Sequence, residues 1–282
     1  MSSVYQQLIT TQTLANILEQ PNLVLLDASI PPIGAIPIPT FSWPEYRIGN
    51  AKRFDLKVEF SDLTSSLSHT MPDKKQFELA ARNLGINNDS QIVVYDDIGI
   101  YSSARAWWMF KAMGHNNVAV LNGGLPKWLK EERATGNDVS QQVAVGNFNA
   151  QLHANLFCDA NDVLKVLNET NVSILDARAY ERFSGHTEEP RAGVRSGHIP
   201  NSQNLPFGQL LNSGEFLPVE QLSEIFARLA TKEQKLVMSC GSGITACILA
   251  LAADVLEYKD ITVYDGSWAE WGSNDKFPIS TS

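Results

Sequence analysis

The sequence has few cysteines and no long apolar segment, and both absences narrow the class of protein. Its three cysteines show no paired spacing, and so sparse and odd a number argues against a disulfide-stapled secreted domain. No stretch approaches the roughly 18 consecutive apolar residues of a membrane-spanning helix. The segment 1–18 also lacks the basic start and unbroken apolar run of a signal peptide. We therefore expect a cytoplasmic protein with no membrane partner.

Basic side chains are scarce relative to acidic ones. The 22 Lys and Arg against 31 Asp and Glu give a formal net charge of -9 and a pI of about 5.1. A surface of that sign repels phosphate backbones overall, so we expect no nucleic-acid partner. The chain of 282 residues is 44% hydrophobic, which is ordinary for a globular protein with room for two domains.

The sequence repeats itself once. Three segments recur in the same order: 24–28 in 174–178, 91–96 in 235–240, and 118–124 in 261–267. A tryptophan follows the last segment of each half, and it lies six residues after Asn122 in one half and six after Asp265 in the other. Several anchors at nearly equal spacing predict a duplicated domain.

Short apolar runs alternate with helical patterns in each half. Runs typical of buried strands lie at 23–26, 92–95, 118–121, 174–175, 236–238 and 261–264, and helical patterns lie at 76–84, 103–113, 160–167, 219–229 and 245–256. Strands separated by helices favour a mainly parallel sheet flanked by helices. We therefore predict an α/β fold with one domain at 1–140, a linker without clear periodicity at 141–157, and a second domain at 158–282.

Cys240 stands where a predicted strand ends and a helical pattern begins, with Gly241 and Gly243 in the turn between them. Ligands of parallel sheets bind at the carboxyl ends of strands, and glycines let backbone N–H groups curl around an anion. With the positive end of the helix dipole, such groups stabilise a thiolate, the nucleophilic form of cysteine. We interpret Cys240 as a nucleophile. The alternative is a buried structural cysteine, which is our interpretation of Cys158 and Cys247.

The first half has Asp96 at the position that corresponds to Cys240. A carboxylate cannot attack a sulfur donor as a thiolate does. One copy with a nucleophile and one without it predict a non-catalytic domain at 1–140 and a catalytic domain at 158–282.

The segment from Cys240 to Ala246, CGSGITA, resembles the active-site loop of the 3-mercaptopyruvate sulfurtransferases, relatives of rhodanese whose usual loop is CGSGVTA. Other stretches agree with that family: DAR at 176–178, RF at 182–183, EPR at 189–191, SGHIP at 196–200 and YDGSW at 264–268. The resemblance covers nearly the whole chain and implies two tandem rhodanese-like domains.

The resemblance also implies a reaction and a site. Sulfur passes from 3-mercaptopyruvate to Cys240 as a persulfide, pyruvate leaves, and a thiol, cyanide or thioredoxin-like acceptor takes the outer sulfur. Arg182 and Arg191 are implied to bind the carboxylate and carbonyl of the donor. The persulfide is held by the loop residues Gly241, Gly243, Ile244 and Thr245. No metal or organic cofactor is implied.

Ser242 and His69 have two interpretations each. Ser242 either assists proton transfer near the donor sulfur or only forms the tight turn. His69 resembles a family histidine near that serine, and otherwise is a solvated loop residue. The family often has an acidic residue just after the pair at 54–55, whereas this chain continues with Leu56 and Lys57, so an acidic partner for a His69–Ser242 relay is not identified. No spacing among the five histidines and three cysteines resembles a zinc site.

Three alternatives to a 3-mercaptopyruvate sulfurtransferase differ in the residues that they require in the loop 240–246. Thiosulfate rhodaneses typically carry basic residues where this chain has Gly241 and Ser242, yet a thiosulfate sulfurtransferase remains the nearest alternative. A non-catalytic rhodanese module that binds partners would not need the nucleophile. A cysteine phosphatase would need an arginine at position 246, where this chain has Ala246, so we exclude that class.

Overall fold

The computed structural model describes residues 7–31, 46–136 and 143–282, and its backbone contacts divide the chain into two compact units. The first unit contains the chain up to Thr64 together with Met71–His153 and Ser213–Phe216. The second contains Ser65–Thr70, Ala154–Asn212 and Leu217–Ser282. Each unit therefore combines one half of the sequence with a short segment from the other half, an exchange that the sequence does not predict.

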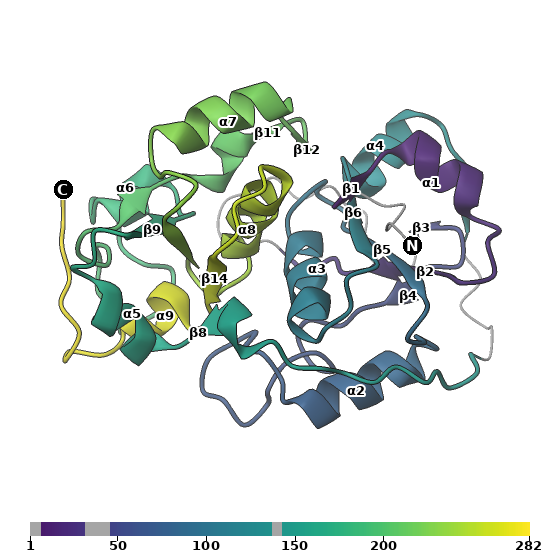
Figure 1. Ribbon diagram of the computed structural model, residues 1–282, viewed down its shortest axis with the longest axis horizontal. Coiled ribbons are helices and arrows are strands. Elements are labelled where there is room, and N and C mark those ends of the chain that lie inside the picture. The colour runs from purple at the N-terminus through teal and green to yellow at the C-terminus, as the bar shows by residue number, and fades with distance from the viewer. Residues whose placement is uncertain (1–6, 32–45, 137–142) are drawn as a thin grey trace. The chain divides into compact units, whose positions relative to one another are not determined.

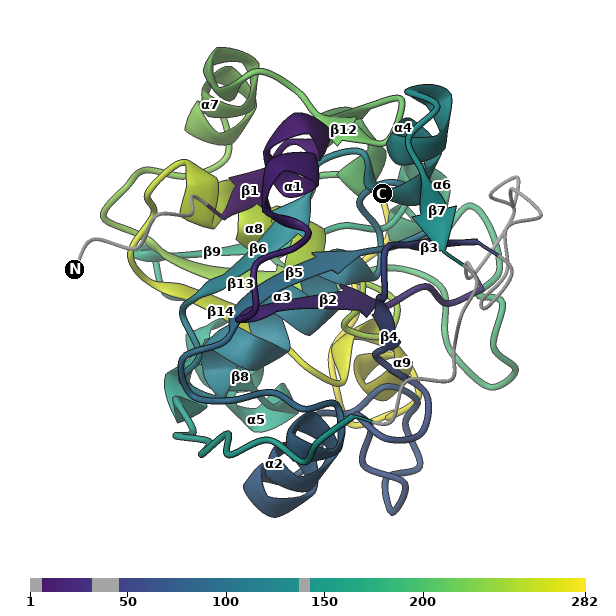
Figure 2. The ribbon, with the colours of Figure 1, turned by 90° about the vertical axis from the view of Figure 1, so that its right-hand side faces the viewer.

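The first unit is built on a parallel five-stranded sheet of order β1-β6-β5-β2-β4. Figures 1 and 2 show α1 and α4 on one face of this sheet and α2 and α3 on the other. The sheet consists of β1 (Leu8–Ile9), β2 (Leu23–Asp27), β4 (Lys52–Arg53), β5 (Gln91–Tyr95) and β6 (Val118–Leu121). The other elements are α1 (Thr11–Ile17), α2 (Lys74–Asn83), α3 (Ser103–Ala112), α4 (Gly124–Lys130), the antiparallel pair β3 (Arg47–Ile48) and β7 (Thr135–Gly136), and β12 (Glu215–Phe216).

Both faces of this sheet are packed, which explains why its strands are continuous apolar runs rather than alternating ones. One face packs Leu25 and Val93 against Leu14 and Trp128 of the covering helices. The other face carries a cluster of phenylalanines at 54, 60, 77, 110 and 148. Aromatic pairs of this kind add to the stability gained from burying their area.

Phe148 belongs to the stretch that the sequence marks as a linker. Its side chain is 2% exposed, and its N–H donates to the carbonyl of Ile86 at 3.0 Å. Gly146 lies so close to Ile86 that a Cβ there would come within 2.0 Å of the same carbonyl oxygen. The end of this stretch is therefore packed onto the first unit, although its sequence has no period. The limits 1–140, 141–157 and 158–282 stay a prediction.

The second unit repeats the architecture with a parallel sheet of order β10-β9-β13-β14-β8. Figure 1 shows α5 and α9 on one face of it and α7 and α8 on the other. The sheet consists of β8 (Phe157–Cys158), β9 (Val172–Asp176), β10 (Gln203–Asn204), β13 (Lys235–Ser239) and β14 (Ile261–Tyr264). The helices are η1 (Ala154–Leu156), α5 (Ala160–Val166), α6 (Tyr180–Phe183), η2 (Phe207–Leu210), α7 (Val219–Ala227), α8 (Ala246–Val255) and α9 (Ser267–Trp271), and β11 is Leu211–Asn212.

The connection from β13 to α8 lies in the core of the second unit. Ser239, the last residue of β13, is level with Asp176 at the end of β9, so the carboxyl ends of both strands meet at one edge. Helix α8 is apolar all round and its residues 246–253 are all buried, which marks it as a core helix. This arrangement confirms the predicted α/β class and fixes the loop between the two elements. Among the described residues, no helix combines the length and the apolar character that crossing a membrane requires.

Candidate active site

Cys240 begins the loop that joins β13 to α8 in the second unit. Its side chain is 1% exposed and it forms no disulfide. Two hydrogen bonds tie the loop to α9: the N–H of Trp268 donates to the Cys240 carbonyl at 2.9 Å, and that of Ala269 donates to the Gly241 carbonyl at 3.0 Å. Gly243 has φ +77, a left-handed conformation that favours glycine. The loop therefore curls tightly and is held from one side.

Most backbone donors of this loop lack a protein partner. Among the described residues, the N–H groups of Gly241, Ser242, Ile244 and Thr245 donate to no protein acceptor. Ser242 is 4% exposed and Ile244 is 1% exposed, and buried N–H groups in proteins are almost always paired. Several such donors in one loop next to a cysteine can bind an anion.

Ser267, the first residue of α9, is the polar side chain that braces the cysteine. Its hydroxyl accepts hydrogen bonds from the N–H groups of Cys240 and Gly243, both at 3.1 Å, and donates to the Tyr264 carbonyl at 2.8 Å. Its oxygen is 4.0 Å from Cys240 Sγ. Ser267 has φ +49, an unfavourable conformation for a residue with a Cβ. Our sequence analysis gave this residue no role, although it lies both in the repeated segment 261–267 and in the family-like stretch YDGSW at 264–268.

The corresponding loop of the first unit has the Asp96 carboxylate in place of the Cys240 thiol, and its N–H groups bind that carboxylate. Asp96 is fully buried, and its two carboxylate oxygens accept five hydrogen bonds of 2.6–3.0 Å. The donors are the N–H groups of Ile98, Gly99, Tyr101 and Ser103 and the Ser103 hydroxyl. The Leu125 N–H donates to the Asp96 carbonyl at 2.9 Å, as Trp268 does to Cys240. The first loop therefore binds an anion of its own, whereas the second leaves its donors available.

Arg182 lies against the loop but already has a carboxylate partner. In α6, its Nε and Nη2 pair with Glu189 at 3.2 and 2.6 Å, and a Cβ on Gly241 would lie 3.2 Å from Nη2. Glu189 is 3% exposed and also accepts from Arg178 at 2.8 Å. Arg178 is held in turn by Asp176 at 2.7 Å. Burial alone would lower the pKa of Arg178, but the carboxylates of Asp176 and Glu189 outweigh it and raise that pKa. Arg178 is therefore a permanent cation. Glu189, which the sequence analysis did not single out, thus fixes one edge of Arg182.

Arg191 reaches the loop from another direction. Its Nη1 lies 3.5 Å from the Gly241 carbonyl oxygen, and its Nη2 donates to the Ser68 hydroxyl at 3.2 Å. Ser68 belongs to the segment 65–70 that the second unit takes from the first half of the sequence. His69, the next residue, has φ +64 and is half-buried. The two predicted site arginines, Arg182 and Arg191, therefore both lie beside Gly241. The predicted histidine, His69, comes directly after Ser68, which is a partner of Arg191.

The other two cysteines and His198 lie in local structural surroundings. Cys247 is fully buried, and its thiol donates to the Gly243 carbonyl at 3.3 Å. This hydrogen bond ties the loop to α8. Cys158 lies at the end of β8, and burial raises the pKa of its thiol to about 12. His198 stacks on Phe183 with ring centres 3.9 Å apart. Within the described part of the chain, no group of three or more His, Cys, Asp or Glu is arranged to hold a metal ion.

Known proteins share both the fold and the length of this chain. The family model of the rhodanese-like domain matches residues 10–131 and 159–274. The chain belongs to this family and carries two copies of its domain. It is 36% identical over 233 residues to the 3-mercaptopyruvate sulfurtransferase of Escherichia coli. The aligned segment covers 82% of this chain and 82% of that one.

Two further relatives cover still more of the chain. The thiosulfate sulfurtransferase of Rattus norvegicus is 37% identical over 278 residues, covering 95% of this chain and 92% of that one. The crystal structure of SseA from Escherichia coli, a 3-mercaptopyruvate sulfotransferase, superposes with a TM-score of 0.82 at 31% identity and covers 94% of this chain and 99% of that one. The resemblance inferred from the loop and the tandem rhodanese fold are confirmed.

Proposed function

We propose that this protein transfers sulfur from 3-mercaptopyruvate to an acceptor through a persulfide on Cys240. The observation that carries the proposal is the contrast between the two loops. In the first unit the N–H groups close on the Asp96 carboxylate, whereas the N–H groups of Gly241, Ser242, Ile244 and Thr245 beside Cys240 have no protein acceptor among the described residues. Relatives named for this donor share about a third of their residues with the chain.

The reaction balances with the groups of the loop and its substrates. The Cys240 thiolate attacks the donor sulfur, the bond between sulfur and C3 breaks, and its electron pair leaves on the enolate of pyruvate, which then takes a proton. The outer sulfur remains on Cys240 as a persulfide anion, held by the N–H groups of Gly241, Ser242, Ile244 and Thr245. An acceptor thiolate or cyanide then attacks that sulfur and releases the Cys240 thiolate.

Arg182 and Arg191 are the proposed binders of the donor's carboxylate and keto oxygen. Glu189 occupies Nε and Nη2 of Arg182, which leaves Nη1 for the substrate. Arg191 keeps one edge for a ligand beside its long contact with Gly241. A guanidinium already paired on one side is rigid, so it loses less freedom when it binds a carboxylate.

Ser242 and His69 are the proposed proton-transfer residues. Ser242 is two residues from Cys240 in a buried loop. His69 follows Ser68, whose hydroxyl accepts from Arg191. A histidine near neutral pH can take a proton and return it, which is what the enolate of pyruvate requires.

The neutral loop favours a monoanionic donor over thiosulfate. Gly241 and Ser242 carry no charge to balance a dianion, whereas two arginines a little away from the sulfur suit an α-keto acid. The rat relative is named for thiosulfate, so thiosulfate is the alternative donor. The proposed acceptors are a small thiol, cyanide or a thioredoxin-like protein. Three free cysteines and a thiol acceptor suit a reducing compartment, so the cytoplasm is the proposed location.

The test is a steady-state assay with 3-mercaptopyruvate and with thiosulfate, combined with mass spectrometry of the protein after donor is added without acceptor. We expect a larger kcat/KM for 3-mercaptopyruvate and a mass increase of one sulfur atom. Cys240→Ser should abolish both, because a hydroxyl stays protonated and forms no persulfide. The matched Cys247→Ser should keep the added sulfur. A larger kcat/KM for thiosulfate would overturn the donor, and sulfur retained in Cys240→Ser would overturn the nucleophile.

A further inference from the structure

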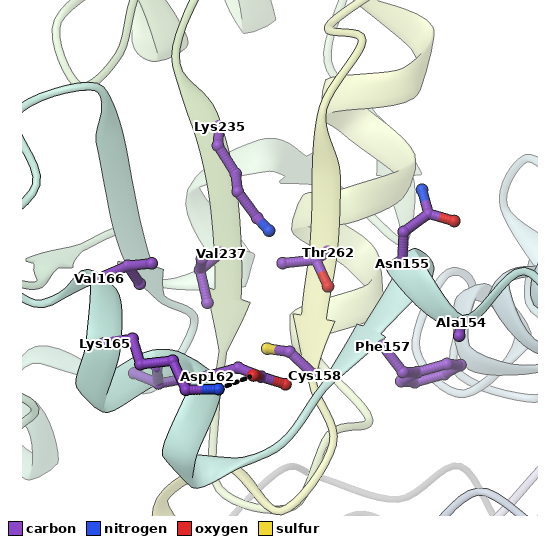
Figure 3. Close-up of a pocket in the computed structure, with 11 residues that line it drawn as sticks. Ala154, Asn155, Phe157, Cys158, Asp162, Lys165, Val166, Lys235, Val237 and Thr262 are labelled. Atoms are coloured by element: carbon purple, nitrogen blue, oxygen red, sulfur yellow. Dashed lines mark hydrogen bonds and ion pairs between the residues drawn. The ribbon is translucent and has the colours of Figure 1, made fainter.

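A cavity of the second unit lies away from Cys240. It has a volume of about 230 Å³ and lies between α5 and the face of the sheet that carries Val237 and Thr262 (Figure 3). Lys235, one of its walls, begins β13, while Cys240 follows the end of the same strand. Five residues of extended strand span roughly 16 Å. This cavity is therefore distinct from the loop that holds the nucleophile.

The floor of the cavity is apolar. Val163 of α5 is fully buried and Val237 of β13 is 1% exposed, and Phe157 and Val166 add further apolar wall. A volume of 230 Å³ holds roughly seven heavy atoms, at about 30 Å³ for a water-sized group. A cavity of this size and lining takes a small organic molecule with an aliphatic part.

The Thr262 hydroxyl is a polar group within this apolar wall. Thr262 is 1% exposed, and its Oγ1 lies beside the Cys158 thiol, with no nitrogen or oxygen partner among the residues that the structure describes. Figure 3 shows this hydroxyl on the cavity side of β14, pointing toward the end of β8 where Cys158 lies. Buried hydroxyls in proteins normally have a stronger partner than an uncharged thiol, so this hydroxyl can donate to a ligand instead.

Lys235 supplies a positive charge without an ion-pair partner in the described residues. Its side chain extends along β13 into the cavity toward Thr262 (Figure 3). The acidic residue at the rim, Asp162, pairs instead with Lys165 at 2.9 Å. Cys158 does not neutralise Lys235, because burial raises the pKa of its thiol to about 12 and keeps it uncharged at neutral pH.

Lys235 and the Thr262 hydroxyl together determine which ligand charge the cavity favours. One unpaired ammonium group and one hydroxyl whose protein neighbour is an uncharged thiol suit a single carboxylate. A dianion such as phosphate would lack a second free cation, and Asp162 at the rim would repel its two charges more strongly than the single charge of a carboxylate. The apolar floor favours a ligand whose other end is a short hydrocarbon chain.

We propose that this cavity binds a small aliphatic monocarboxylate, whose carboxylate is held by Lys235 and the Thr262 hydroxyl and whose chain lies against Val163 and Val237. The site is independent of the sulfur chemistry, so Cys240→Ser should bind the ligand as the unaltered chain does.

Butyrate is the probe, titrated into the isotope-labelled full chain while the amide resonances of Val163 and Thr262 are followed by NMR. We expect saturable shifts at both residues. Lys235→Met removes the charge and keeps the chain length, and we expect it to weaken binding at least tenfold. Thr262→Val keeps the shape without the hydroxyl and should weaken binding several-fold. Lys276→Met, which removes an exposed lysine of the same unit, should leave binding unchanged.

Four results would overturn the proposal: no saturation by butyrate, shifts confined to the loop 241–245, unchanged affinity in Lys235→Met, or unchanged affinity in Thr262→Val. Inorganic phosphate is the competing probe. Phosphate binding more tightly than butyrate at the same resonances would also overturn it, because the charge argument would then be wrong.

Discussion

At the scale of single residues, Ser267 has a strained backbone conformation, which indicates that its side chain is needed at this position. The first unit has Gly124 at the corresponding position, with φ +53 against +49 for Ser267. A Cβ on Gly124 would lie 2.4 Å from the Asp96 carbonyl oxygen, so only glycine fits there. The second unit keeps a serine at this conformation because its hydroxyl accepts from Cys240 and Gly243.

Two substitutions separate the hydroxyl from the backbone strain. Ser267→Ala and Ser267→Gly both remove the acceptor, and each should lower kcat/KM about tenfold or more, because two buried N–H groups lose their partner. Ser267→Gly should also unfold at a higher temperature than Ser267→Ala, since glycine relieves the left-handed strain. The readouts are steady-state kinetics and thermal unfolding, with the exposed Ser223→Ala as control. Activity of Ser267→Ala equal to that of the unaltered chain would remove Ser267 from the positioning role.

Arg191 is expected to act on substrate binding rather than on the bond-breaking step. Its contact with Gly241 is long and its other partner is the Ser68 hydroxyl, so its loss leaves no buried carboxylate unpaired. We expect Arg191→Ala to raise KM for 3-mercaptopyruvate about tenfold or more and to change kcat less. Arg228→Ala, at the end of α7, is the control. Unchanged KM and kcat would exclude Arg191 from the donor site.

Asp97 gives the first unit a pH dependence. Burial, together with the charges of Asp96 and Asp27, raises the pKa of Asp97 from 3.8 to about 7, and the Ser29 hydroxyl opposes the shift. The folded state therefore binds this proton more tightly than the unfolded chain does. Stability is lost as the pH rises from about 4 to about 7 and changes no further above that.

Asp97→Asn removes this titration. The variant should gain melting temperature over the unaltered chain as the pH rises through that window, with the largest gain above pH 7. Thermal unfolding between pH 4 and 8 measures the difference, and Asp89→Asn, an exposed residue, is the control. A gain that is largest at acid pH would have the wrong sign and would contradict the assignment.

At the scale of elements, the strand–loop–helix connection is the feature that both units share. In each unit the carbonyl just after a buried strand accepts an N–H at 2.9 Å from the short helix that follows the next strand, α4 in the first unit and α9 in the second. What differs is the occupant of the loop. Asp96 satisfies its own loop through five hydrogen bonds, whereas four N–H groups of the Cys240 loop have no protein acceptor among the described residues.

Removal of the Asp96 carboxylate should destabilise the first unit strongly. Asp96→Ala leaves several buried N–H groups without an acceptor, and we expect a loss of more than about 3 kcal/mol in the free energy of unfolding. Chemical denaturation followed by fluorescence measures it, with Asp89→Ala as the exposed control. A loss equal to that of the control would show that the carboxylate does not stabilise the loop.

At the scale of the whole molecule, sulfur loading should be visible as stability. A persulfide anion bound by the loop donors stabilises the folded state only, so it acts as a bound ligand does. We expect the unfolding transition of the second unit to move to a higher temperature after 3-mercaptopyruvate is added without acceptor, and to return when cyanide is added. Calorimetry on the full chain resolves this. A similar shift in Cys240→Ser would mean that the donor itself, not the persulfide, stabilises the unit.

The sequence by itself determined the duplication, the α/β class and the candidate nucleophile. These follow from local features: apolar runs of strand length, helical periods between them, and a glycine-containing turn after a strand. Such features do not depend on distant contacts, so Asp96 and Cys240 could be matched from the order and spacing of the repeated segments. The membership in a tandem rhodanese family also followed from the loop residues at 240–246.

Only the tertiary structure decided which groups surround the cysteine. Ser267 is 27 residues from Cys240 along the chain, and the segment 65–70 joins the second unit from the other half of the sequence. Glu189 claims one edge of Arg182, and Phe148 packs a stretch without period onto the first unit. Apart from the Glu189–Arg182 pair, whose members are seven residues apart, each of these contacts joins distant parts of the chain. In all of them a hydroxyl, a carboxylate or a ring finds the partner that burial demands. Sequence periodicity carries no record of such partners.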